Sequence, residues 1–105
     1  MLLSEILIKY KKEFENNKCS ITTVRHNDIL SFNVHLKGNI HLISFVCSPF
    51  IDYDKINLTD NTSYQNMIDS SIKYNIDFDY IVVEYSDKKK IRLFNEDLYP
   101  YLEDN

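Results

Sequence analysis

The sequence predicts a single α+β domain in which a mainly antiparallel sheet is packed by two helices. The chain has 105 residues, which is the length of one domain. Its apolar residues recur at a helical period in two segments and follow strand patterns in five others. The order of the segments is helix, three strands, helix and two strands, followed by a short C-terminal helix.

The helices are predicted from apolar spacing and from the residues at their ends. The first runs from residue 3 to about residue 16, and the second covers residues 62–74, where Thr62 and Gln65 have the spacing of a capping box. Asn95 followed by two acids indicates the start of a short last helix before Pro100. The apolar stripe of the first helix consists of Leu3, Ile6, Leu7, Tyr10 and Phe14.

Five segments have the composition of β-strands. The first is rich in β-branched residues, and the second alternates apolar with polar side chains. The third is a nearly continuous apolar run, which predicts a central strand covered on both faces. The last two predict a hairpin with Ile91 and Leu93 facing the core. The five segments are residues 21–26, 30–36, 40–48, 78–85 and 90–94.

Gly38 lies in the turn between the second and third predicted strands. A three-residue turn there pairs Leu36 with Ile40 and His35 with His41, which keeps apolar residues opposite one another. Such a turn needs a residue in the left-handed region, so we expect Gly38 or the residue after it to have a positive φ.

The rest of the composition excludes several classes of protein. A single glycine excludes glycine-rich phosphate loops, so we expect neither nucleotide chemistry nor a cofactor. No signal peptide is expected, because Ser4 and Glu5 interrupt the N-terminal apolar residues, and no apolar run approaches the roughly 20 residues needed to span a bilayer. Cys19 and Cys47 are expected to be reduced thiols in a cytoplasmic protein.

Histidine and cysteine supply the candidates for a catalytic or metal site. His35 and His41 would face one another in the expected register, and His26 or Asp28 is the nearest third ligand for a metal ion. The alternative is that these histidines are exposed on a polar sheet face. Cys47 paired with a histidine would be a nucleophile, but a packed thiol is the simpler interpretation at the end of an apolar strand. We therefore assign no catalytic residue and no metal ligand.

The order of elements from the first helix to the fourth strand is similar to that of the restriction-endonuclease-like core. The signature of that family is an acid on the second strand and Glu-x-Lys on the third. Here only Asp28 could stand for the first acid, and residues 43–47 contain neither Glu nor Lys. The resemblance therefore implies a decayed or divergent member, which remains an alternative alongside a small metal-binding enzyme.

Charge is distributed unevenly along the chain. Residues 1–51 carry a net charge of +2, whereas residues 52–105 carry −6 and seven of the eight tyrosines. Such an acidic, tyrosine-rich half repels nucleic-acid phosphates and attracts a basic protein surface. The clusters of Lys are diluted by acids, so direct binding of nucleic acid is not expected. The predicted partner-binding residues are Asp77, Asp79, Tyr80, Glu84, Tyr85, Asp87, Glu96 and Asp97.

This composition resembles that of small acidic proteins that block nucleases or other nucleic-acid-processing enzymes. Bacterial toxin immunity proteins, antitoxins and phage-borne inhibitors of restriction or CRISPR effectors are of this kind. The sequence therefore predicts a cytoplasmic, non-enzymatic inhibitor that binds a toxin, a nuclease or a defence effector through that partner's basic surface. A homodimer formed through strand edges is left open as an alternative.

Overall fold

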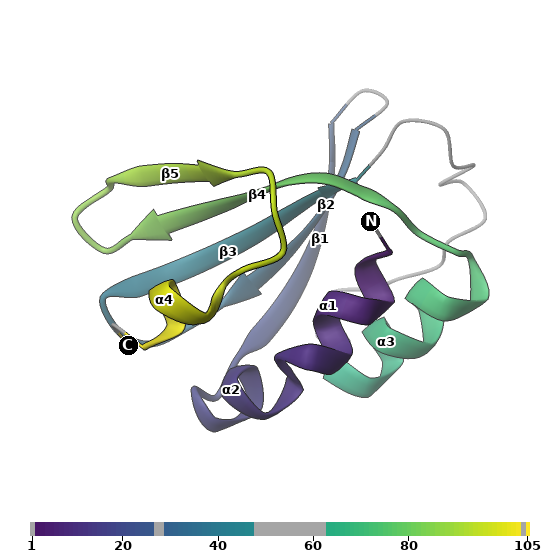
Figure 1. The fold of residues 1–105 in the computed structure, drawn as a ribbon, viewed down its shortest axis with the longest axis horizontal. Helices are drawn as coiled ribbons and strands as arrows, with labels where there is room; N and C mark the ends of the chain where they lie inside the picture. Colours follow the sequence, from purple (N-terminus) through teal and green to yellow (C-terminus); the bar gives the residue numbers. More distant parts are fainter. Residues whose placement is uncertain (1, 27–28, 48–62, 104) are drawn as a thin grey trace.

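The computed structural model describes residues 2–26, 29–47, 63–103 and 105, and it confirms the predicted α+β architecture (Figure 1). Five antiparallel strands form one sheet in the order β1-β2-β3-β4-β5, so each strand lies beside its neighbours in sequence. No helix among the described residues is long and apolar enough to cross a membrane. The elements are α1 (Leu3–Lys9), α2 (Lys11–Asn16), β1 (Ser20–His26), β2 (Ile29–His35), β3 (Ile40–Cys47), α3 (Tyr64–Lys73), β4 (Phe78–Tyr85), β5 (Lys90–Leu93) and α4 (Tyr99–Leu102).

The predicted first helix is divided into α1 and α2 at Tyr10. Tyr10 has φ −107° and ψ 15°, which lie outside the α-helical region. Backbone hydrogen bonds from Tyr10 to Ile6 and from Phe14 to Tyr10, both 3.1 Å long, continue across this residue. The predicted apolar stripe is confirmed although the helix is divided, because all five of its residues are buried.

The N-terminus of α3 is capped one residue later than predicted. The Ser63 hydroxyl accepts a hydrogen bond from the Asn66 N–H at 3.1 Å. Gln65, which was expected to complete a capping box, instead donates to Asp69 Oδ1 at 3.0 Å. Thr62, the expected cap, lies outside the described residues.

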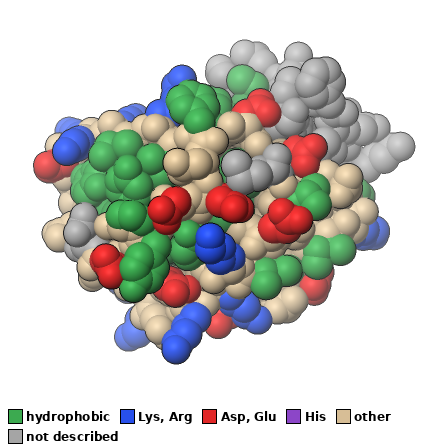
Figure 2. Space-filling model, in the orientation of Figure 1, with side chains coloured by type: hydrophobic (Ala, Val, Ile, Leu, Met, Phe, Trp, Pro, Cys, Tyr) green, Lys and Arg blue, Asp and Glu red, His purple; other side chains and the backbone are tan. Residues whose placement is uncertain are grey.

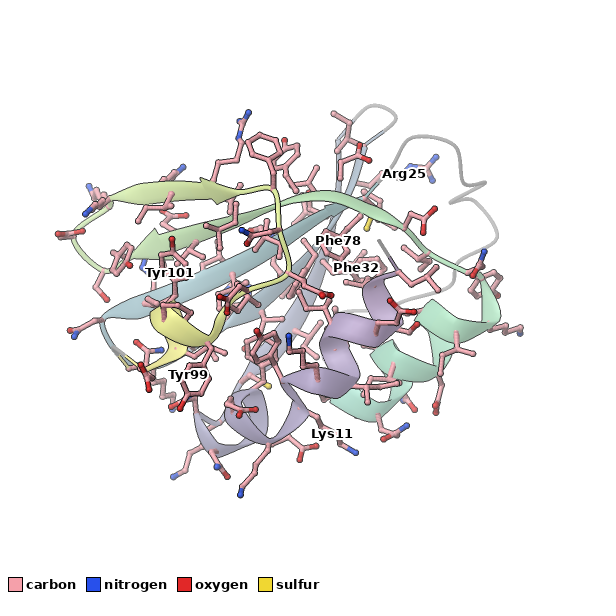
Figure 3. All side chains as sticks on the ribbon, viewed as in Figure 1. Lys11, Arg25, Phe32, Phe78, Tyr99 and Tyr101 are labelled. Carbon is pink, nitrogen blue, oxygen red and sulfur yellow. The ribbon has the colours of Figure 1, made fainter. Side chains whose placement is uncertain are left out.

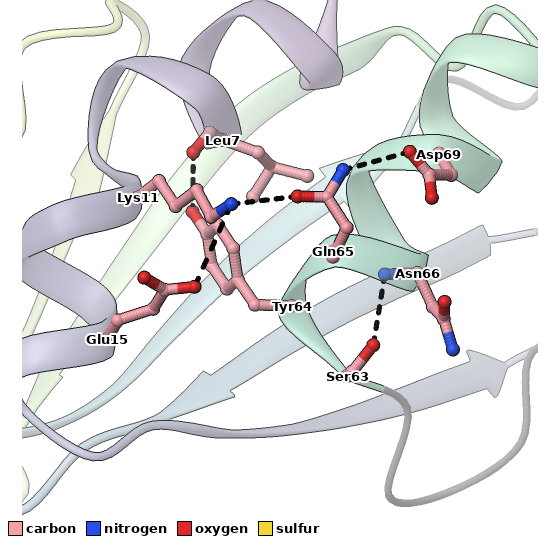
Figure 4. Close-up of polar contacts among 8 residues, drawn as sticks. All are labelled: Leu7, Lys11, Glu15, Ser63, Tyr64, Gln65, Asn66 and Asp69. Carbon is pink, nitrogen blue, oxygen red and sulfur yellow. Dashed lines mark hydrogen bonds and ion pairs between the residues drawn. The ribbon is translucent and has the colours of Figure 1, made fainter.

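Helices α1 and α3 are joined by side chains near one end of each (Figure 4). The hydroxyl of the buried Tyr64 donates to the Leu7 carbonyl at 2.8 Å. Nearby, the Lys11 ammonium donates to Gln65 Oε1 at 2.8 Å and lies 4.0 Å from the Glu15 carboxylate. The first of these contacts excludes water, so it holds the two helices more firmly than the exposed pair does.

The helices pack on one face of the sheet, as Figure 1 shows. Phe32 of β2 and Phe45 of β3 pair with one another and are fully buried beneath the helices. The prediction that β3 is central is confirmed. On the face opposite the helices, Val46 is buried whereas Leu42 and Ser44 are partly exposed, so among the described residues the prediction that β3 is covered on both faces holds only at Val46.

The predicted register of the β2–β3 hairpin is wrong. His35 lies opposite Leu42, and the Leu36 N–H donates to the His41 carbonyl at 3.0 Å. The two histidines are therefore not opposite one another, and the geometric basis of the expected histidine pair is lost.

A β-bulge explains the difference in register. The inward positions of β3 are set by Ile43 and Phe45, which pair with buried residues of β2. The register with β4 shifts between Ile40 and Leu42, so Ile40 is also buried although it is out of phase with Ile43. The prediction assumed strict alternation from Ile40 onward, and a bulge breaks that alternation.

Gly38 serves a different purpose from the one predicted. Neither it nor Asn39 has a positive φ. Instead, a Cβ atom on Gly38 would lie 2.7 Å from Asn105 Oδ1. The Asn105 side chain accepts a hydrogen bond from the Ile40 N–H at 2.7 Å and donates to the Ile40 carbonyl at 3.2 Å. Gly38 therefore leaves room for a side-chain amide that binds the start of β3.

The last helix begins at Tyr99 rather than at Asn95 as predicted. The side chains of Asn95 and Asp97 accept hydrogen bonds from the backbone N–H groups two residues further on, at 3.2 and 3.3 Å. These bonds form turns instead of a first helical turn. Pro100 lies within the first turn of α4, where a backbone N–H has no helical partner.

The contact of Gly38 with Asn105 predicts that the effect of Gly38→Ala depends on residue 105. In the natural protein, the new methyl group displaces Asn105 and should lower the free energy of unfolding by about 0.5–1.5 kcal/mol, as expected for lost hydrogen bonds. In an Asn105→Ala background, the same change should raise it by about 0.4–1 kcal/mol, because alanine restricts the unfolded chain. Urea denaturation of the four proteins measures both values. An equal loss in the two backgrounds would contradict this account of Gly38.

Candidate functional site

The structure distributes the eight predicted partner-binding residues over four places. They do not form one continuous patch, because side chains alternate between faces along β4 and the later residues follow turns. The residues are Asp77 and Asp79 at the beginning of β4, Tyr80 and Glu84 on the sheet face opposite the helices, Tyr85 and Asp87 at the β4–β5 turn, and Glu96 and Asp97 before α4.

The β4–β5 turn borders a surface pocket. The Ser86 hydroxyl donates to the Gly38 carbonyl at 2.6 Å, which joins this turn to the β2–β3 loop. Asp87 Oδ1 accepts a hydrogen bond from the Lys89 N–H at 3.0 Å, so its carboxylate stabilises the turn. The residues that line the pocket are Asn39, Tyr85, Ser86 and Asp87.

Neither cysteine is an activated thiol. Burial raises the pKa of the Cys47 thiol far above its ordinary value, and the nearby carboxylates of Asp79 and Asp77 raise it further. Partial burial likewise raises the pKa of Cys19. The nucleophile is the thiolate, so both side chains are held in their less reactive form. The prediction that Cys47 is a packed thiol is confirmed, because it is buried in the core.

The candidate metal ligands contact other groups. His35 Nε2 lies 2.8 Å from the Thr22 hydroxyl, and His41 Nε2 lies 3.6 Å from a Glu84 carboxylate oxygen. Within the described ranges, no three His, Cys, Asp or Glu side chains converge as metal ligands would. The His26 side chain and Asp28 lie outside the described residues.

The third strand also lacks the polar groups of an endonuclease-like centre. Ile43, Phe45 and Cys47 are buried in the core at the positions where the resemblance would require Glu and Lys. The resemblance in element order therefore brings no acid–lysine pair to this strand.

An acidic surface forms where the C-terminal segment passes α2. We define it as Glu13 of α2 together with Glu96, Asp97, Tyr99 and Glu103. The last four residues are exposed, and Figure 3 shows Tyr99 projecting from α4 toward α2. A hydrogen bond to the Glu103 carboxylate, together with its negative charge, raises the pKa of Tyr99, and Glu13 adds a smaller contribution. Carboxylates from two separate parts of the chain therefore act on the charge of one tyrosine.

Tyr10 holds the C-terminal segment in place. Its hydroxyl donates to the Glu96 carbonyl at 3.2 Å and accepts from the Leu98 N–H at 3.0 Å. Leu98 and Leu102 are buried in the core, so the intervening Tyr99 is turned outward. The backbone of the acidic surface is thus fixed at residues 96, 98 and 102 before any partner binds.

The carboxylates of this segment are available to a partner. Within the described part of the chain, no Lys or Arg forms an ion pair with Glu96, Asp97 or Glu103. Figure 2 shows Asp and Glu side chains interspersed with hydrophobic ones over the middle of this side of the molecule. The sequence prediction included Glu96 and Asp97 but missed Glu13, Tyr99 and Glu103. The four-residue spacing of Tyr99 and Glu103 is a usable signal, whereas nothing in the sequence indicates the approach of Glu13.

Comparison of the chain with protein-family models, with curated proteins and with solved structures finds no match. The chemistry of the site therefore follows from its own residues.

The position of Tyr10 predicts the effect of removing its hydroxyl. Tyr10→Phe removes the hydroxyl that accepts from the Leu98 N–H and donates to the Glu96 carbonyl. The Leu98 N–H then keeps only its 3.0 Å bond to the Glu96 carbonyl, and the free energy of unfolding should fall by about 1 kcal/mol. Tyr101→Phe is the matched control, because the Tyr101 hydroxyl forms no hydrogen bond to any described residue, and its effect should stay within about 0.5 kcal/mol. Chemical denaturation measures both, and equal losses would show that the Tyr10 hydroxyl does not anchor the segment.

The environments of the two thiols predict selective alkylation. In the folded protein, iodoacetamide should modify the half-buried Cys19 slowly and leave Cys47 unmodified, because Cys47 is 1% exposed and its pKa is raised. In denaturant, both should react at similar rates. Mass spectrometry of tryptic peptides gives the fraction of each cysteine that is alkylated. Rapid labelling of Cys47 in the folded state would contradict its assignment as a buried thiol.

Proposed function

We propose that this protein is a non-enzymatic inhibitor that binds a basic, nucleic-acid-processing protein through the acidic surface. The observation that carries the proposal is the group of exposed carboxylates of Glu96, Asp97 and Glu103, which have no ion-pair partner among the described residues and lie in the same segment as the exposed Tyr99. In this proposal the partner is a toxin, a nuclease or a defence effector.

The charges of the acidic surface would speed association with such a partner. Each carboxylate contributes little alone, because water screens exposed charges. Several carboxylates of one sign create a field that orients an approaching basic surface and raises the association rate. Glu13, Glu96, Asp97 and Glu103 provide that field from two elements that Tyr10 holds together.

Tyr99 would provide contact area once the charges have brought the partner close. It is 53% exposed and carries both an aromatic ring and a hydroxyl. Tyrosine is enriched among the residues that dominate binding energy, because its ring can be buried while its hydroxyl still forms a hydrogen bond.

The charge also favours one class of partner. Proteins that act on nucleic acids carry Arg and Lys for phosphate groups, and the same side chains bind carboxylates with similar geometry. An inhibitor whose carboxylates occupy those side chains competes directly with the substrate. In this mechanism the protein needs no catalytic residue and no cofactor of its own.

Charge reversal with a matched control tests the proposal. We compare the natural protein with Glu96→Lys/Asp97→Lys/Glu103→Lys and with Glu5→Lys/Glu15→Lys/Asp69→Lys, which changes the net charge equally at exposed positions outside the acidic surface. Each is used to capture proteins from a lysate of the native host, and the captured protein is then purified and its affinity measured by calorimetry. The first variant should bind at least about tenfold more weakly, and the control should bind within about threefold of the natural protein.

Two further measurements define the mechanism. The affinity of the natural protein should fall steeply between low and high salt, and the captured partner should lose its activity on nucleic acid in proportion to its occupancy. Equal affinity of the two triple variants, affinity independent of salt, or a partner that stays active when saturated would each contradict the proposal.

A further inference from the structure

The outer hairpin of the sheet, formed by β4 and β5, carries basic and aromatic side chains on the face opposite the helices. β5 is an edge strand, as Figure 1 shows, and its side chains alternate between the two faces. Ile91 and Leu93 are its partly buried residues, so the side chains between and beside them point away from the core. These exposed side chains, together with the Tyr80 ring of β4, form what we term the aromatic–basic patch: Tyr80, Lys90, Arg92 and Phe94.

Two aromatic rings and a guanidinium are in contact at one end of the patch. The Phe94 ring lies 6.1 Å from the Tyr80 ring, and the Arg92 guanidinium carbon lies 4.5 Å from the centre of the Tyr80 ring. Phe94 is 69% exposed, so most of its side chain is free to contact a ligand. The Tyr80 ring orients Arg92, because a guanidinium stacks favourably on an aromatic face. An exposed aromatic surface and an oriented cation therefore lie side by side.

The positive charges of the patch have no acidic partner in the described part of the chain. Lys90 and Arg92 form no ion pair with any described residue, and Glu84, which pairs with Lys90 across the strands, has its carboxylate 3.6 Å from His41. Salt screens exposed charges beyond about 10 Å, so the charge near the patch matters more than that of the whole chain. The β4–β5 hairpin carries four bases and three acids within a half of the chain whose net charge is −6; they are Lys88, Lys89, Lys90 and Arg92, and Asp79, Glu84 and Asp87.

These features suit a ligand that carries both flat aromatic groups and regularly spaced negative charges. Single-stranded nucleic acid has both, because its unpaired bases stack on aromatic side chains and its phosphates bind Arg and Lys. Side chains on one face of a strand are about 7 Å apart. A nucleic-acid strand that follows β5 would therefore meet Phe94, Arg92 and Lys90 in succession. An acidic protein segment supplies negative charges as well, but its carboxylates do not stack on an aromatic ring.

We propose that the aromatic–basic patch binds single-stranded nucleic acid, with a base stacked on Phe94 and the adjacent phosphates bound by Arg92 and Lys90. The sequence alone did not indicate this site, because acids dilute the lysines along the chain. Strand alternation places Lys90 and Arg92 on one face, and the β4–β5 register brings Arg92 onto the Tyr80 ring. The local arrangement therefore differs from the linear order of charges.

This site does not depend on the proposed function, because the aromatic–basic patch shares no residue with the acidic surface. If both proposals hold, the protein binds a nucleic-acid-processing partner at one site and a single-stranded segment of nucleic acid at the other.

Fluorescence anisotropy with labelled oligonucleotides tests the site. The probes are DNA and RNA strands of one mixed sequence, about twelve nucleotides long, each used alone and as a duplex with its complement. At low salt the natural protein should bind at least one of the single strands. It should bind the corresponding duplex at least about tenfold more weakly, because a paired base cannot stack on Phe94. The affinity for the single strand should fall as salt is added.

Substitutions with matched controls assign the binding to the patch. Phe94→Ala should weaken binding at least about fivefold, as expected for the loss of one stacked base. Arg92→Gln should weaken it and lower the slope of log affinity against log salt by about 0.7, as expected for one phosphate contact. The controls are Ile72→Ala on α3, where Ile72 is 57% exposed, and Lys12→Gln on α2, where Lys12 is exposed. Both should bind within about twofold of the natural protein, and circular dichroism confirms that each variant is folded.

Four outcomes would each overturn the proposal. They are no binding of either single strand at millimolar protein, equal affinity for single strand and duplex, an equal effect of Phe94→Ala and Ile72→Ala, and displacement of the bound strand by an equal concentration of decaglutamate. The last result would show that the patch binds acidic protein segments instead. None of these outcomes bears on the acidic surface, whose test uses a protein partner and other variants.

Discussion

The packing of Phe14 is the interaction on which the rest of the structure depends. Its ring lies 6.4 Å from Tyr10, 5.7 Å from Tyr64 of α3 and 6.4 Å from Phe45 of β3, and it is fully buried. Phe45 in turn lies 6.0 Å from Phe78 of β4. Aromatic pairs of this kind stabilise beyond their buried area. They join the helices to the two central strands, and because Phe45 points to one face of the sheet, the helices are held on that face.

The acidic surface is a consequence of the same packing. Tyr10 contributes its ring to the Phe14 cluster and its hydroxyl to the backbone of the C-terminal segment. The buried side chains of Leu98 and Leu102 complete the attachment. The charge of Glu13 acts on Tyr99 because Tyr10, directly before α2, binds the backbone of this segment. A surface group made of residues far apart in the sequence is therefore supported directly by the core.

The two faces of the sheet differ in the chemistry that they offer. The helix-bearing side presents unpaired carboxylates and an exposed tyrosine, which suit a charged and soluble partner. The sheet face opposite the helices presents the exposed Val24, Ile29 and Phe94 among mostly polar residues. The β-bulge at Ile40–Leu42 contributes to this difference, because it allows Ile40 to enter the core while Leu42 remains on the face opposite the helices.

The sequence by itself determined the order and type of the elements, the buried stripe from Leu3 to Phe14 and the inward residues of β5, because hydrophobic periodicity acts within a few residues. It also predicted Glu96 and Asp97 of the candidate site. Only the tertiary structure decided the β2–β3 register, the role of Gly38 and the meeting of Glu13 with Tyr99. Each of these depends on contacts between distant parts of the chain, such as Asn105 with Ile40 or Tyr10 with Leu98, which leave no periodic pattern in the sequence.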